Sequence, residues 1–220
     1  ITDYEEVQKK HFIDSLSLVK AIDLTHDISV IDIGTGAGFP GIPLKIAFPN
    51  LKVTLLDSLN KRVQFLNAVI EKLELREIEA FHGRAEDFAK PGLMREKYDL
   101  CVSRAVANLT TLSEYCLPFV KVGGLFISYK SEKIEQEKKE AGKAIKLLGG
   151  KTEKQVELYL PDSDIYRNLF IIKNRSVFTY MAVCFILFFF SFGLASTTKT
   201  SAYAACHSFF QRYLERYMTL

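Results

Sequence analysis

VIDIGTGAGFPGIPL, residues 30–44, decides the fold of this chain, because an apolar run leads directly into three glycines at alternate positions. The run has the length and composition of a buried strand, and the residues from 41 onward suit a helix. Gly34, Gly36 and Gly38 therefore lie in the turn between them. Glycine permits positive φ and lets a ligand approach the main chain. The stretch predicts a ligand-binding loop at the edge of a parallel sheet.

The same order of strand and then helix repeats along the chain. Continuous apolar runs predict strands at residues 29–33, 52–57, 77–82, 98–103 and 125–130. The stretches between them predict helices at residues 41–47, 59–73, 109–120 and 131–148. Uninterrupted apolar strands that alternate with helices indicate a parallel sheet covered on both faces. After Gly150, two strands at 154–160 and 167–173, joined by the turn PDSD, predict a closing antiparallel hairpin.

These elements divide the chain into three parts. Residues 1–28 form a helical lead-in, residues 29–174 form an α/β domain with a mostly parallel seven-stranded sheet, and residues 175–220 form an apolar tail. In the lead-in we expect an amphipathic helix at 4–21, capped by Thr2 or Asp3. Its expected apolar face consists of Val7, Phe12, Leu16 and Val19.

The composition argues against several kinds of site. The chain has 220 residues and a formal net charge of only +3, so a nucleic-acid partner would have to be met by a local basic patch. Its four cysteines are scattered, with no CxxC pair and no histidine at ligand spacing, which argues against a zinc site or a disulfide framework. We therefore expect no metal and a reducing, cytoplasmic location.

The glycine loop departs from both common phosphate-binding patterns. A dinucleotide fingerprint needs a third glycine at position 39, which is Phe, and a Walker loop needs a GK[ST] sequence that is absent. Acids follow successive predicted strands instead, namely Asp32, Asp57 and Glu86. Three carboxylates would repel a diphosphate, whereas they suit a cofactor with a ribose, an ammonium and a sulfonium. S-adenosylmethionine has that pattern, and Asp57 is spaced to accept the ribose hydroxyls.

Several segments together resemble one protein family, the GidB/RsmG family. They are DIGTGAGFPGIPL (32–44), LLDSLNKRVQFL (55–66), GRAEDF (83–88), YDLCVSRAVANL (98–109) and LPDSDIYRNLFIIKN (160–174). KHFIDSL (10–16) resembles the segment that precedes the catalytic domain of that family, so the resemblance covers about residues 1–174. It implies that the helices which open the family's members are missing from this chain. It also implies a Rossmann-like, class I S-adenosylmethionine-dependent methyltransferase that modifies N7 of a guanosine in 16S ribosomal RNA of the small subunit.

The resemblance also implies a set of site residues. Cofactor-binding residues are expected at Gly34, Gly36, Gly38, Phe39, Asp57, Ala85, Glu86 and Arg104. Within this set, Asp57 takes the ribose, and Ala85 and Glu86 lie along the adenine. Arg104 reaches into the active site, where it or Lys130 is expected to contact the substrate at guanine O6 or at a phosphate.

The chemistry of N7 methylation explains why the sequence offers no catalytic set. Guanine N7 carries a free lone pair and the leaving group is a neutral thioether, so no general base is required and orientation supplies most of the acceleration. Amine methylation is disfavoured because SRAV replaces the [DN]PP[YF] loop, and pyrimidine C5 methylation because Cys101 lies within an apolar strand. A small-molecule methyltransferase, a nicotinamide oxidoreductase and a catalytically dead, membrane-tethered fragment are the alternatives. We expect a monomer.

The tail has a different composition. Residues 176–198 carry no charge and are rich in Phe, in place of the basic tail that the resemblance implies. The run is long enough for a membrane helix, which we place at 177–196 with Lys173 and Arg175 on its cytoplasmic side. Alternatively, a frameshift or a wrong join in the coding sequence replaced the basic tail. We favour that alternative, because an enzyme acting on ribosomes gains no obvious benefit from an anchor.

Overall fold

The computed structural model describes residues 3–104, 107–131 and 134–175. The predicted tail, with its membrane helix at 177–196, lies outside the described residues. Within the described ranges, no helix is both long and apolar enough to cross a membrane.

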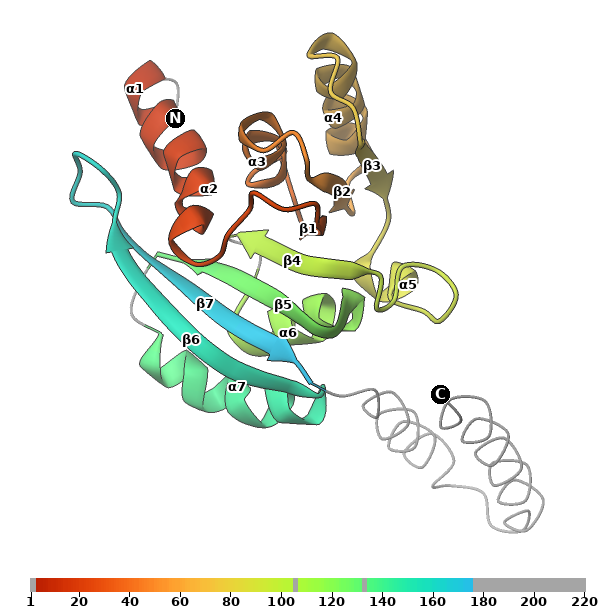
Figure 1. Cartoon of the computed structure of the whole chain (residues 1–220), viewed down its shortest axis with the longest axis vertical. Coiled ribbons are helices and arrows are strands. Elements are labelled where there is room, and N and C mark those ends of the chain that lie inside the picture. The colour runs from red at the N-terminus through yellow and green to blue at the C-terminus, as the bar shows by residue number, and fades with distance from the viewer. Residues whose placement is uncertain (1–2, 105–106, 132–133, 176–220) are drawn as a thin grey trace. The chain divides into compact units, whose positions relative to one another are not determined.

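A seven-stranded sheet forms the centre of the molecule (Figure 1). Its spatial order is β3-β2-β1-β4-β5-β7-β6; strands β1 to β5 pair in parallel, and β7 pairs antiparallel with both of its neighbours. The predicted sheet and its antiparallel hairpin are thus confirmed, with β7 inserted between β5 and β6. The strands are β1 Ser29–Ile33, β2 Lys52–Asp57, β3 Ile78–His82, β4 Tyr98–Arg104, β5 Val120–Lys130, β6 Gly150–Tyr159 and β7 Tyr166–Asn174.

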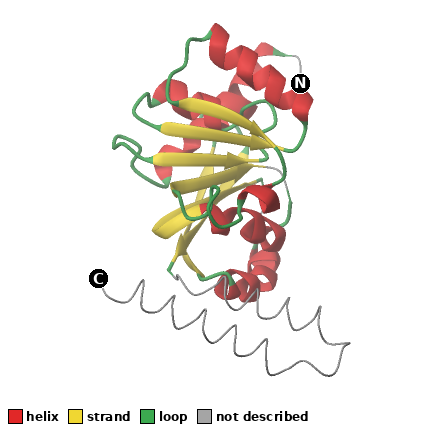
Figure 2. Ribbon diagram, turned by 90° about the vertical axis from the view of Figure 1, so that its right-hand side faces the viewer, coloured by secondary structure: helices red, strands yellow, loops and turns green. Residues whose placement is uncertain are grey.

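Helices cover both faces of the sheet (Figures 1 and 2). One face carries α3 Gly41–Ala47, α4 Asn60–Lys72 and the N-terminal helical segment, and its core includes Leu18, Leu44 and Leu66. The other face carries α5 Ala85–Phe88, α6 Leu109–Cys116, the 3₁₀ turn η3 Leu117–Phe119 and α7 Glu135–Leu147. Because helices cover both faces, the central strands bury consecutive residues rather than alternate ones, as in Leu100–Ser103 of β4.

The N-terminal segment is helical but changes its winding along its length. It passes through α1 Tyr4–Val7, the π-helical η1 Gln8–Ile13, α2 Asp14–Leu16 and the 3₁₀ helix η2 Ser17–Lys20. Asp3 is the N-cap, as predicted, since its Oδ1 accepts a hydrogen bond from the Glu6 amide at 3.0 Å.

The predicted apolar face of this segment was wrong at Phe12 and Val19, whereas Leu16 packs against the core. Phe12 and Val19 are 41% and 48% exposed, whereas Asp14 and Ser15 are buried. A buried carboxylate is tolerated when charged partners surround it. Asp14 has such partners on two strands of the sheet, so a polar face turns inward at this point.

Strand β5 begins at Val120, five residues before its predicted start. The strand therefore includes Gly123 and Gly124, which precede its predicted start. A Cβ at Gly124 would lie 2.7 Å from the Asp99 carbonyl oxygen, so close packing against β4 explains this glycine. The four-residue helix α5 was not predicted, because a single turn is too short to show a helical period.

Candidate active site

The candidate site lies at the carboxyl ends of β1 and β4, where the strand order of the sheet reverses. From β1 the chain builds outward to β2 and β3, whereas β4 and β5 lie on the other side of β1. The glycine loop follows β1, and Arg104 is the last residue of β4. In open α/β sheets, ligands bind in the crevice at this switch point.

The glycines of the loop have different roles. Gly34, Gly36 and Gly38 all have positive φ, at 70°, 63° and 95°. A Cβ at Gly36 would meet no atom within 4 Å, whereas a Cβ at Gly38 would lie 2.4 Å from the Ile42 side chain. Gly38 is therefore needed for packing of the loop against α3. Gly36 is the position where the main chain borders open space.

Asp32 holds the glycine loop in place through hydrogen bonds from two residues that follow β1. Its Oδ2 accepts hydrogen bonds from Thr35 Oγ1 at 2.7 Å and from the Gly41 amide at 2.9 Å, and its Oδ1 has no partner among the described residues. The side chain is fully buried, and this burial raises its pKa from 3.8 to about 6. The expectation that Asp32 faces the ligand was therefore wrong, because the strand buries it beneath the loop that it holds.

Asp57 ends β2 and ties it to the glycine loop. Its Oδ2 accepts from the Gly36 amide at 2.9 Å and lies 3.3 Å from Arg62 Nη1, and its Oδ1 accepts from the Leu59 amide at 2.9 Å. Only 2% of the residue is exposed, while Arg62 is half exposed. A carboxylate has about four acceptor sites, so these bonds leave capacity for a further donor.

The start of α5 lies beside Asp57. The Gly83 amide donates to the Asp57 carbonyl at 3.0 Å, and α5 begins two residues later. Glu86 is exposed, whereas Ala85, the first residue of α5, is buried. We expected three acids around one ligand. Asp57 at the end of β2 and Glu86 in α5 lie on neighbouring segments, whereas Asp32 is buried beneath the glycine loop.

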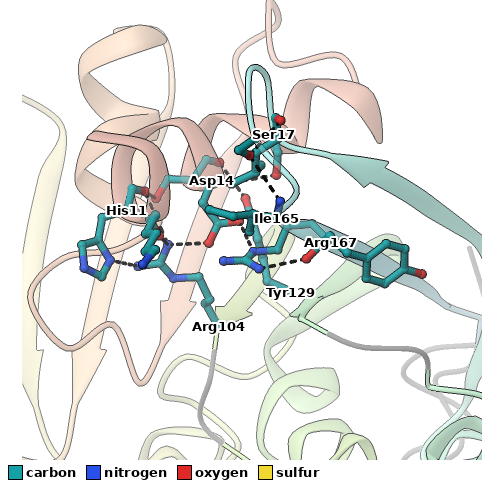
Figure 3. A network of polar contacts seen from close by, with 12 residues as sticks. His11, Asp14, Ser17, Arg104, Tyr129, Ile165 and Arg167 are labelled. Atoms are coloured by element: carbon teal, nitrogen blue, oxygen red, sulfur yellow. Dashed lines mark hydrogen bonds and ion pairs between the residues drawn. The ribbon is translucent and has the colours of Figure 1, made fainter. Parts of the chain in front are cut away.

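A buried carboxylate joins the N-terminal segment to two strands (Figure 3). Asp14 Oδ2 lies 3.0 Å from Arg104 Nη1 on β4, and its Oδ1 accepts from Arg167 Nε on β7 at 2.7 Å. Asp14 is 2% exposed and the arginines are 14% and 16% exposed. Nearby, Tyr129 donates its hydroxyl to the Ser15 carbonyl at 2.8 Å. The cluster carries one carboxylate for two guanidinium groups and is therefore electropositive.

Sequence reasoning anticipated Arg104 but missed Asp14 and Arg167. Asp14 is 90 positions from Arg104 and 153 from Arg167, so no local spacing joins them. One signal could have revealed Asp14: it is an acidic residue within the N-terminal helix, which we expected to be amphipathic.

Aromatic rings lie between this cluster and the glycine loop. The Phe39 ring is stacked with His11 at a centroid distance of 5.1 Å and meets Phe12 edge-on at 5.2 Å. The Arg104 guanidinium lies 5.3 Å from the centroid of the Phe39 ring. Arg104 Nη2 is 3.3 Å from His11 Nδ1. Phe39, Arg104 and His11 therefore come together at the switch point.

Lys130, which ends β5, is engaged within the protein. Its ammonium donates to the Ala107 carbonyl at 2.9 Å and to Glu137 Oε1 at 2.7 Å, and 13% of its side chain is exposed. Glu137 Oε1 also accepts from the Leu109 amide. These contacts hold the segment after β4 against α7, which gives Lys130 a structural role. The described residues contain no group of three or more His, Cys, Asp or Glu that could hold a metal ion.

The sheet order, the bare loop after β1 and the acids at the strand ends define a class I S-adenosylmethionine-dependent methyltransferase fold. A solved S-adenosylmethionine-dependent methyltransferase from Aquifex aeolicus shares this fold, with a TM-score of 0.55 at 19% identity over 78% of this chain and 94% of that one. The chain belongs to the family described as GidB, rRNA small subunit methyltransferase G, which matches residues 1–166.

Two relatives within this family are highly similar to the chain. A Ribosomal RNA small subunit methyltransferase G from Lachnoclostridium phytofermentans is 57% identical over 174 residues, which are 79% of this chain and 72% of that protein. The protein of the same name from Clostridium botulinum strain Loch Maree is 54% identical over 174 residues, covering 79% and 73%.

Proposed function

We propose that this chain transfers a methyl group from S-adenosylmethionine to N7 of a guanosine in 16S ribosomal RNA of the small subunit. The observation that carries the proposal is the similarity to two proteins named for methylation of small-subunit ribosomal RNA. Each match extends over 174 residues, which are 79% of this chain. We assign the activity to residues 29–174 together with the N-terminal segment, acting as a monomer in the cytoplasm.

The residues at the switch point fit a nucleoside cofactor. The open space over Gly36 allows a ligand to lie against the main chain. In this proposal Gly34, Gly36 and Phe39 border the cofactor, Gly38 shapes the loop, Asp57 accepts the ribose hydroxyls, and Ala85 and Glu86 line the adenine side. Arg62 also contacts Asp57, but it is half exposed and its side chain can turn aside when a ribose binds.

The chain's own residues have to orient the base rather than move a proton. S-adenosylmethionine, when bound, supplies an electrophilic methyl group on a sulfonium. Guanine N7 attacks with a lone pair that is free at neutral pH, so the side chains have to fix the approach of the base. The electropositive cluster of Arg104 and Arg167 around Asp14 suits the anionic backbone of RNA at the edge of the site.

The test is direct methylation of ribosomal RNA. The full chain is incubated with methyl-labelled S-adenosylmethionine and either small ribosomal subunits or naked 16S RNA, and the digested nucleosides are separated. We expect label in 7-methylguanosine from small-subunit RNA and none in a parallel incubation with large-subunit RNA. Calorimetry with S-adenosylmethionine and with NAD is the matched binding control. Label in another nucleoside, or tight binding of NAD alone, would contradict the proposal.

A further inference from the structure

The imidazole of His11 has no role in the chemistry described so far. We propose that His11 is a specificity-determining residue, which donates its Nε2–H to the O6 atom of the target guanine, and that Asp14 and Arg104 position it for this contact. The inference rests on the proposed function, because it takes guanine as the target base.

The location of His11 is the first argument. It lies in η1, partly exposed, and its ring is stacked on Phe39, with an interplanar angle of 27°. Phe39 belongs to the loop that contains Gly36, and Arg104 at the end of β4 approaches the same ring. The imidazole therefore stands over the β1 and β4 switch point, where the proposed reaction takes place.

The tautomer of His11 follows from its partner. A guanidinium only donates hydrogen bonds, so Nδ1, at 3.3 Å from Arg104 Nη2, has to be the acceptor. The proton of the neutral ring is then on Nε2. Burial and the nearby Arg104 lower the pKa of His11 from 6.5, and Lys10 acts in the same direction, whereas Asp14 raises it. The neutral form of the ring therefore predominates at pH 7.

Arg104 is itself fixed. Its Nη1 donates to Asp14 Oδ2 at 3.0 Å and lies 3.4 Å from the carbonyl oxygens of Lys10 and His11. Asp14 in turn is held by Arg167. Figure 3 shows one ring nitrogen of His11 joined to Arg104 and the other side of the ring turned away from the cluster. None of the described residues provides a hydrogen bond to Nε2.

A single donor beside N7 distinguishes the purines. Guanine presents the acceptor O6 next to N7, whereas adenine presents an amino donor there. A neutral imidazole N–H binds the first and is repelled by the second. Because it contacts O6, it leaves the N7 lone pair free to attack.

The test removes each partner of the proposed hydrogen bond in turn, first O6 of the target guanine in the RNA and then the imidazole of His11 in the protein. Once the methylated guanosine has been mapped, 16S RNA is made with guanine or 2-aminopurine, which keeps N7 and lacks O6, at that position. The ratio of kcat/KM for the two RNAs is measured for the wild type, His11→Phe, which keeps the stacking, and His11→Gln, whose amide nitrogen lies near the Nε2 position. His26→Phe, at an exposed histidine, is the control.

We expect His11→Phe to lose about tenfold in kcat/KM on the guanine RNA and almost nothing on the 2-aminopurine RNA, which is the effect of one hydrogen bond. His11→Gln and His26→Phe should keep the wild-type ratio. Equal losses on both RNAs in His11→Phe would overturn the role. So would ¹⁵N NMR spectra that place the His11 proton on Nδ1. A wild-type enzyme inactive on guanine RNA would instead refute the proposed function, and this role with it.

Discussion

Asp32 makes the stability of the fold depend on pH in an unusual direction. Because burial raises its pKa from 3.8 to about 6, the folded state binds a proton more tightly than the unfolded chain between these values. The free energy of unfolding should therefore fall as pH rises from about 4 to about 6. The interval between the two pKa values corresponds to about 3 kcal/mol. This loss should be complete at pH 7, where the carboxylate is ionised in both states.

The variant Asp32→Asn isolates this contribution. Its amide oxygen can accept from Thr35 and Gly41 as Oδ2 does, and its amino group replaces the unpartnered Oδ1. We expect the wild type to lose about 3 kcal/mol relative to the variant between pH 4 and pH 7, measured by urea unfolding followed by circular dichroism.

An exposed carboxylate gives a control of opposite sign. Asp87 has a pKa lowered by its hydrogen bond to Lys90, so the wild type should gain stability relative to Asp87→Asn as pH rises through the acid range. A constant difference between the wild type and Asp32→Asn from pH 4 to pH 7 would refute the reasoning about Asp32.

Three further predictions concern the loop, the ribose acid and the buried carboxylate. Gly36→Ala should lose S-adenosylmethionine binding in calorimetry at a cost in stability of about 1 kcal/mol, whereas Gly38→Ala, which meets Ile42, should cost more in stability. Asp57→Ala should weaken S-adenosylmethionine binding at least tenfold, since charged hydrogen bonds are worth about 1.5–3 kcal/mol; unchanged affinity would remove Asp57 from the site. Asp14→Asn should lower the free energy of unfolding by about 3–5 kcal/mol. The double variant Asp14→Asn/Arg167→Met should recover part of this loss, and strictly additive losses would show that the pair is not coupled.

The parts of the fold that were predictable are those with a local cause. β1, β2 and α3 have the predicted bounds, because each has a local signal at one end: Gly34 follows β1, Asp57 ends β2 and Gly41 begins α3. β5 was mispredicted at its start because the reason for Gly124 is the carbonyl of Asp99, which lies on another strand. The local sequence pattern predicts whether a segment is a strand or a helix, but it does not predict which strand packs against that segment.

The candidate site shows the same division. The glycine loop and Asp57 could be found from the sequence, because the βα turn and the end of the next strand are defined by short spacings. The position of Asp32 beneath the loop could not be found from the sequence. An acidic residue at a strand end gives the same sequence pattern whether its side chain faces a ligand or the loop. Its burial is set by Gly41, whose missing Cβ leaves room for the Asp32 carboxylate.

The N-terminal segment belongs to the site as much as to the lead-in. The arginines on β4 and β7 are largely buried, and two guanidinium groups at one edge of a sheet require a buried anion to balance them. Asp14 is that anion, and it enters on a helix outside the predicted domain of residues 29–174. The same helix brings His11 onto Phe39. A boundary at residue 29 therefore separates the sheet from the carboxylate that pairs with its arginines, and we propose that the functional unit includes the helix that carries Asp14.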